Sequence, residues 1–155
     1  MRKKIISVVI FVLVAGFSFR ASASPLIDLR TEVIEEGKRI KSAFKGSKDI
    51  ILLSSMWDAC MITGVQLDAY FAMVGVVGTI KEEDLTPVSV EYLISWLGRV
   101  KDNNLVNIKN LSGIANAERD TKAQIKRVVE YYAKLNSQID AEIKGLQALK
   151  TSLGG

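Results

Sequence analysis

Two carboxylates in the most apolar part of the chain are the side chains best placed to do chemistry. Asp58 and Asp68 lie in the stretch from Asp49 to Ile80, which holds only three charged residues. On a helix, their spacing of ten residues is roughly 15 Å along the axis, too far for acid–base catalysis between the two. Because a buried carboxylate is costly without a partner, we expect each to meet a basic or hydrogen-bonding group on a neighbouring helix. Arg99 and Lys101 are the nearest candidates in sequence.

The same two carboxylates belong to a seam of polar and small residues that follows the apolar stretch at steps near 3.5 residues. The polar members of this seam are Ser54, Asp58, Asp68 and Thr79. As an alternative to structural pairing, these side chains would line a polar slot inside a helical bundle and contact a ligand. Trp57 and Trp96 would then border the slot, although amphipathic helices commonly bury such aromatic residues in a core. Together the six residues form the candidate ligand-binding set.

Most catalytic and metal chemistry is disfavoured by composition. The chain has no histidine and one cysteine, so structural zinc, iron–sulfur and histidine-ligated haem sites are excluded, and no intrachain disulfide can form. Cys60 with Met56, Met61 and Met73 would resemble a soft copper site, but Met61 is adjacent to Cys60 and points elsewhere on a helix. Burial of Cys60 in a core is the simpler interpretation. There is neither a phosphate-binding loop nor a nucleophile elbow, so we expect no enzyme, no metal and no cofactor.

The first 23 residues have the three parts of a secretory signal peptide. Basic residues at positions 2–4 precede an apolar run from Ile5 to Phe19, and a small-residue cleavage motif follows at positions 21–23. The alternative is an uncleaved membrane anchor, but fifteen apolar residues fall short of the roughly 20 that a span needs. We therefore expect cleavage near Ala23 and a periplasmic or secreted product.

Removal of this segment also removes the excess of positive charge. The chain has 21 basic and 17 acidic residues, and four of the basic residues lie in the first 23, which leaves 17 of each. The sequence pI of about 9.2 therefore comes from the export segment. Without a basic face of any size, nucleic acid is not an expected partner.

Residues 24–155 are expected to form one all-α domain, an antiparallel four-helix bundle with a long, heptad-patterned C-terminal helix. Prolines occur only at Pro25 and Pro87, where each would open a helix. The expected helices run from Pro25 to Phe44, from Asp49 to Ile80, from Pro87 to Ser112, and from a cap at Asn116 to Leu153. One continuous helix from Pro87 to Leu153 is the alternative, and it would carry Gly113 at a cost near 1 kcal/mol.

Apolar spacing predicts which faces are buried. On the first helix the stripe is Leu26, Leu29, Val33, Ile40 and Phe44, with Gly37 beside it permitting a close helix approach. On the third it is Val90, Leu93, Leu97, Val100, Leu105, Ile108 and Leu111, with a turn skipped at 101–104. On the last it is Ile125, Val128, Tyr132, Leu135, Ile139, Ile143, Leu146, Leu149 and Leu153. The second helix is apolar on nearly every face, and we expect it to sit most deeply.

Three functions remain open. The favoured hypothesis is a non-catalytic interaction or scaffold module of the cell envelope, which binds a protein partner or self-associates through coiled-coil packing. The first alternative is a bundle that holds an apolar small molecule between its helices. The second alternative is a membrane-inserting or pore-forming protein that uses the helix from 49 to 80, whose Gly64, Gly75 and Gly78 suit packing in lipid. Asp58 and Asp68 argue against this alternative, because carboxylates inside a membrane are expensive.

Overall fold

The computed structural model describes residues 25–81 and 84–154, and these form four α-helices without any strand. The helices are α2 (Pro25–Ser42), α3 (Ile50–Gly78), α4 (Pro87–Ser112) and α5 (Arg119–Leu153). This confirms the predicted all-α, four-helix class. The predicted export segment lies outside the described residues.

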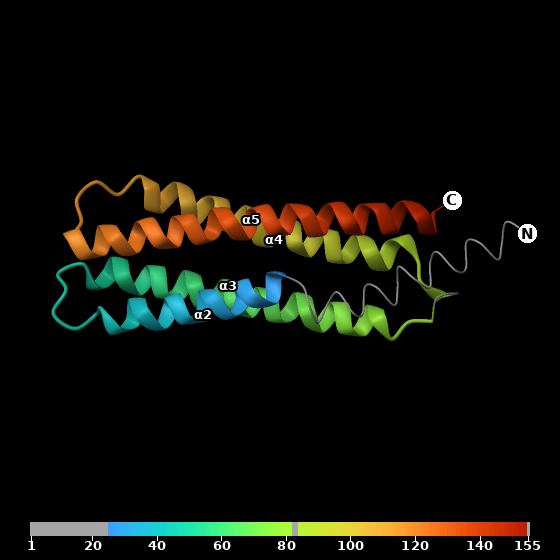
Figure 1. Ribbon diagram of the computed structural model, residues 1–155, viewed down its shortest axis with the longest axis horizontal. Coiled ribbons are helices and arrows are strands. Elements are labelled where there is room, and N and C mark those ends of the chain that lie inside the picture. Colours follow the sequence, from blue (N-terminus) through green and yellow to red (C-terminus); the bar gives the residue numbers. More distant parts are fainter. Residues whose placement is uncertain (1–24, 82–83, 155) are drawn as a thin grey trace, which may run out of the picture.

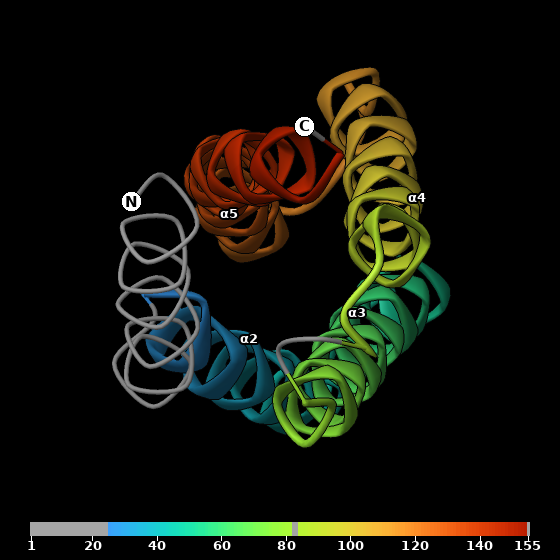
Figure 2. The same cartoon turned by 90° about the vertical axis from the view of Figure 1, so that its right-hand side faces the viewer.

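Consecutive helices lie side by side and run in opposite directions (Figure 1). Viewed along the bundle, the order around it is α2, α3, α4 and α5 (Figure 2). α2 is the shortest with 18 residues and packs along only part of the 29-residue α3, whereas α5 has 35 residues. The C-terminal end of α3, beyond Asp68, therefore extends past α2 (Figure 1).

α2 and α3 form a hairpin that brings two helix backbones close together. A Cβ atom added to Gly37 would lie 2.5 Å from the Met61 side chain, and one added to Gly64 would lie 3.3 Å from Ile34. The close approach predicted at Gly37 is therefore present. The turn that joins the two helices contains Gly46 at φ +85°, a left-handed conformation that glycine adopts without strain. α2 ends at Ser42, two residues before the predicted Phe44, which lies in this turn.

α4 and α5 form the second hairpin, and they are two helices rather than one, as predicted. Thr86 precedes α4 with Pro87 in its first turn, and Gly113 ends it. α5 is preceded by Glu118, whereas the predicted cap, Asn116, lies in the connection. Across this hairpin, Lys101 pairs with Asp140 near the middle of the two helices, and Lys150 pairs with Glu91 near the open end.

Hydrogen bonds donated by tyrosine and tryptophan side chains join the α2–α3 hairpin to the α4–α5 hairpin. The Tyr131 hydroxyl donates to the Leu29 carbonyl at 2.9 Å, and the Tyr70 hydroxyl donates to Glu142 Oε1 at 2.8 Å. The Trp96 indole donates to the Gln66 carbonyl at 3.0 Å. Each pair spans a different interface, so all four helices contribute to one core.

The core follows the predicted stripes of α2 and α5 closely. Leu26, Leu29, Val33 and Ile40 on α2 are buried, and on α5 every predicted stripe residue is buried except Ile143 and Leu153, which are half-buried. On α4 the stripe differs from the prediction at the skipped turn. Asn104 is fully buried there, whereas Leu105 is 47% exposed. The stripe therefore continues through a polar residue that spacing of apolar residues could not reveal.

The prediction that the apolar helix sits most deeply is wrong. Only 33% of the most apolar 18-residue window of α3 is buried inside the bundle. α3 packs through one face, on which Leu53, Met56, Cys60, Leu67 and Tyr70 are buried. Its opposite face is equally apolar but lies outside, because the neighbouring helices cover it from one side only.

Candidate functional site

The four polar residues of the predicted seam lie on the sides of α3 that face away from the core. Asp58 and Thr79 are exposed, and Ser54 is half-buried. The Thr79 hydroxyl donates to the Val76 carbonyl at 2.7 Å and so ends the helix. Asp68 accepts two hydrogen bonds from Arg30 on α2, at 2.8 and 2.9 Å. The structure therefore does not bring these four side chains together in a slot between helices.

The expected partners of the carboxylates were wrong. Asp68 pairs with Arg30 rather than with Arg99 or Lys101, since α2 lies beside this face of α3 and Lys101 is engaged by Asp140. The pairing with Asp68 raises the pKa of the Arg30 guanidinium. Asp58 forms no ion pair with any residue in the described part of the chain.

The two tryptophans of the candidate set lie in separate places. Trp57 is half-buried beside α2, where the Lys41 ammonium group lies 5.1 Å from its ring centroid. Trp96 is half-buried between α3 and α4, with the Arg99 guanidinium 5.9 Å from its ring. Both rings pack against the core, as aromatic residues of amphipathic helices usually do.

One side of α3 is uncovered along most of its length, and we call it the outer stripe. It follows steps of four and three residues through Ile51, Ser55, Asp58, Ile62, Val65, Ala69, Ala72 and Val76. Seven of these residues are exposed and Ala69 is half-buried. The exposed fraction is 82% at Ile51, 68% at Val65 and 66% at Val76, high values for β-branched aliphatic side chains. From Ile62 to Val76 the stripe is apolar without interruption, and an exposed apolar surface of this kind is a marker of interaction sites.

α3 is also the one helix in the described ranges that is long and apolar enough to cross a membrane. That property follows from its length and composition, which core helices of other bundles share. Asp58 is one of the eight residues of the outer stripe, and its ionised carboxylate is poorly suited to hydrocarbon.

A layer of polar side chains crosses the interior of the bundle. Asn104 on α4 donates from Nδ2 to Asn136 Oδ1 on α5 at 2.9 Å, and the two residues are 0% and 7% exposed. Thr63 on α3 donates to the Tyr132 hydroxyl on α5 at 3.4 Å. Asn104 Oδ1 and Asn136 Nδ2 have no hydrogen-bond partner within the described residues. The layer therefore holds one free acceptor and one free donor in the core.

Cys60 lies in the core as expected, and its surroundings suppress its reactivity. The side chain is fully buried, and it lies near Glu36 and the Tyr132 hydroxyl. Burial, with a smaller contribution from the negative charge of Glu36, raises the pKa of the thiol to about 12. Since the thiolate is the nucleophile, Cys60 is a packing residue at neutral pH.

A charged groove lies between α2 and α5. Its centre is Glu36, whose side chain is only 7% exposed and pairs with Arg39 at 3.1 Å and with Arg127 at 3.2 Å. Beside it, Lys134 pairs with Glu32 at 2.9 Å. The pocket here has a volume of about 240 Å³ and is lined by three acidic and three basic side chains and by Tyr131. With balanced charges already paired, the groove holds α2 on α5 rather than presenting a charge to a ligand.

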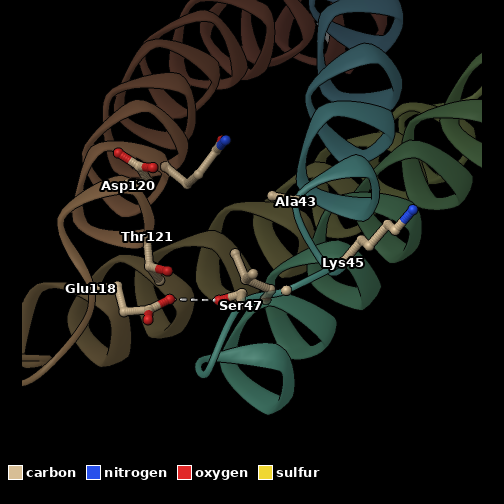
Figure 3. A pocket seen from close by; sticks show the side chains of 9 residues that line it. Ala43, Lys45, Ser47, Glu118, Asp120 and Thr121 are labelled. Carbon is tan, nitrogen blue, oxygen red and sulfur yellow. Dashed lines mark hydrogen bonds between the residues drawn. The ribbon is translucent and has the colours of Figure 1, made fainter.

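A second polar pocket, of about 280 Å³, lies where the α2–α3 and α4–α5 connections meet (Figure 3). Ser47 and the Lys48 amide donate to Glu118 Oε2 at 3.0 and 3.3 Å, and the Glu118 amide donates to Asp49 Oδ2 at 2.7 Å. Asp49 and Glu118 immediately precede α3 and α5, so each contacts the connection that leads into the other helix. We call these four residues the end clasp. Lys45 points away from the Glu118 carboxylate in Figure 3.

These surface pockets, with two others of about 430 and 360 Å³ near the ends of α4 and α5, include none of the six candidate residues. No group of three or more His, Cys, Asp or Glu side chains in the described ranges is arranged to hold a metal ion. Comparisons of the chain with protein-family models, with curated proteins and with solved structures give no match. The interpretation of function therefore depends on the geometry alone.

Proposed function

We propose that the protein is an exported, non-catalytic helical interaction module of the cell envelope, and that the outer stripe of α3 is its binding surface. The observation that supports this most strongly is that Ile51, Val65 and Val76 are exposed along a helix whose other face builds the core. Removing such side chains from water stabilises a complex by roughly 25 cal/mol for each Å² of apolar surface that is buried. A chain without a partner would gain nothing from this surface.

The described side chains also favour binding over catalysis. Cys60 is held as a buried neutral thiol, and the buried carboxylate Glu36 is bound by two arginines. No nucleophile is therefore poised beside a base in the described core. The alternative of an apolar small molecule between helices is less well supported, since Trp57 and Trp96 both pack against the core and lie apart.

Site-specific photo-crosslinking in the producing cell tests the proposal. A photoreactive phenylalanine derivative at Val65 should give an adduct, whereas the same residue at Val106 on α4 should not. The two positions are matched because both are exposed valines in mid-helix, at 68% and 57%. Equal adduct patterns from both positions, or no adduct from Val65, would show that the outer stripe is not a binding surface. The mass of the adduct reports whether the contact is a second copy, another protein or a lipid.

A further inference from the structure

The outer stripe has the spacing of a coiled-coil seam. Its eight positions advance by alternating steps of four and three residues, which average 3.5 and keep a seam on one side of a helix. α3 therefore has two faces with helical periodicity. One builds the bundle of its own chain, and the other, with Ile62 and Val65 at its middle, is suited to a second helix.

The seam is complementary to itself when two copies run in opposite directions. A two-fold axis that crosses the outer stripe between Ile62 and Val65 places each residue of the stripe opposite another residue of the stripe in the second copy. The facing pairs are Ile51 with Val76, Ser55 with Ala72, Asp58 with Ala69, and Ile62 with Val65. The pairs of small or short residues, Ser55 with Ala72 and Asp58 with Ala69, thus lie between the pairs of bulky aliphatic residues at the middle and at the ends of the contact. A contact of this kind uses the same surface on both copies and closes as a dimer.

Charge selects this direction over the parallel one. Two parallel copies in register would place Asp58 against Asp58 of the second copy, and like charges in contact oppose association. In the antiparallel arrangement Asp58 faces Ala69, the neighbour in sequence of Asp68, which Arg30 contacts. The Arg30–Asp68 ion pair of the second copy therefore lies at the height of Asp58, so the antiparallel contact places no unpaired like charge opposite Asp58.

The size of the contact indicates a reversible complex. At 1.5 Å per residue the 29 residues of α3 extend over about 43 Å, and one helix is about 10 to 12 Å wide. A single helix face is thus of the order of 450 Å² per copy, below the roughly 800 Å² per partner of a stable protein–protein interface. We propose that the outer stripe of α3 forms a reversible homodimer, in which the α3 helices of two copies pack antiparallel about a two-fold axis. This inference rests on the proposed function and names its partner as a second copy of the chain.

A lipid surface is the rival occupant, and Asp58 distinguishes the two. Within hydrocarbon the Asp58 carboxylate would be desolvated without a partner. At the dimer contact the Asp58 carboxylate lies beside small side chains and stays open to water on one side. The stripe therefore fits a second copy better than a bilayer.

Sedimentation equilibrium of the isolated protein, with its N-terminus identified by mass spectrometry, tests self-association. From micromolar to millimolar concentrations the wild type should change reversibly from monomer to dimer. Val65→Lys places two ammonium groups at the centre of the contact and should raise the dissociation constant at least about tenfold. Val106→Lys makes the same chemical change at an exposed valine of α4 and should leave the dissociation constant unchanged. Far-UV circular dichroism checks that both variants remain folded.

Disulfide formation tests the direction of the helices. Residues 55 and 72 are 17 positions apart, about 26 Å on one helix, so cysteines there cannot pair within a chain. The double variant Ser55→Cys/Ala72→Cys should form a disulfide-linked dimer on mild oxidation, whereas Ser55→Cys alone should not. A dimer cross-linked through Ser55→Cys alone would overturn the antiparallel arrangement.

A wild type that stays monomeric up to millimolar concentrations would overturn the homodimer, as would equal effects of Val65→Lys and Val106→Lys. Flotation with phosphatidylcholine and phosphatidylglycerol vesicles then distinguishes this failure from that of the proposed function. Vesicle binding that Val65→Lys abolishes would keep the stripe as a binding surface and replace the second copy with lipid. Loss of dimerisation, of vesicle binding and of the Val65 photo-adduct together would overturn both proposals.

Discussion

Replacing both buried asparagines with leucine should stabilise the protein, although it removes a hydrogen bond. In the wild type, Asn104 and Asn136 share one hydrogen bond of 2.9 Å, while Asn104 Oδ1 and Asn136 Nδ2 are buried without a partner in the described core. The bond contributes about 0.5 to 1.5 kcal/mol, whereas each buried polar atom without a partner costs about 1 to 3 kcal/mol. Leucine has the same number and branching of side-chain heavy atoms as asparagine, so it fits the same position, with methyl groups that are larger than the amide oxygen and nitrogen.

The expected magnitudes follow from counting these atoms. Asn136→Leu alone loses the bond and leaves both polar atoms of Asn104 without partners, so the number of such atoms stays at two. The single variant should be less stable than the wild type by about 1 kcal/mol at most, because the leucine gains some apolar burial. The double variant Asn104→Leu/Asn136→Leu leaves no such atom and should be more stable than the wild type by about 1 to 5 kcal/mol.

Urea unfolding followed by far-UV circular dichroism measures these differences in the free energy of unfolding. An unchanged dependence of that free energy on urea concentration shows that unfolding stays two-state. Asn103→Leu, at an exposed neighbouring position of α4, is the matched control and should change stability by less than about 0.5 kcal/mol. A double variant that is less stable than the wild type would refute the reasoning. It would show that the two amides have all their hydrogen bonds, for instance through a trapped water molecule.

Three further predictions concern single residues and pH. Gly145→Ala should stabilise the protein by about 1 kcal/mol, since an added Cβ meets nothing within 4 Å in mid-helix, whereas Gly46→Ala should destabilise it by about 1 to 2 kcal/mol at its left-handed φ. Thermal unfolding compares the two, and a loss at position 145 would contradict the open space there. Cys60 should resist alkylation at pH 8 and react fully in urea; fast labelling of the folded protein would disprove its burial. Finally, stability should fall as pH rises through about 9 to 11. Burial raises the pKa of Cys60 and of the core tyrosines, so these groups stay protonated when folded but ionise on unfolding near pH 9 and 10. Each of these groups lowers the free energy of unfolding by up to about 1.4 kcal/mol per pH unit. A urea midpoint of unfolding that stays constant to pH 11 would refute this prediction. The core tyrosines are Tyr70, Tyr131 and Tyr132.

The sequence predicts α5 well because its apolar residues repeat without interruption from Ile125 to Leu153. The start of α4 is equally clear, since Thr86 and Pro87 together open a helix. By contrast, Asn104 was missed because a polar residue on a buried face breaks the apolar pattern. Only its pairing with Asn136, 32 residues away, makes its burial tolerable.

The candidate site was less predictable than the fold, for a reason that α3 illustrates. A helix that is apolar on every side gives no periodic signal of which side its neighbours cover. The spacing predicts the seam of Ser54, Asp58, Asp68 and Thr79 as a set, but it does not show that the seam faces outward. The partner of Asp68 was also unpredictable, because Arg30 lies 38 residues away and becomes its neighbour only through the α2–α3 turn.

The end clasp affects the order of events in folding. Each hairpin forms from residues close in sequence, whereas the clasp joins Ser47 and Asp49 to Glu118, about 70 residues away. Contacts between distant segments must overcome a larger loop-closure entropy, so they form after the local ones. The clasp should therefore close late, when the two hairpins have docked. Bonds that form after the rate-limiting step slow unfolding without speeding folding, so these few bonds contribute to the lifetime of the folded bundle.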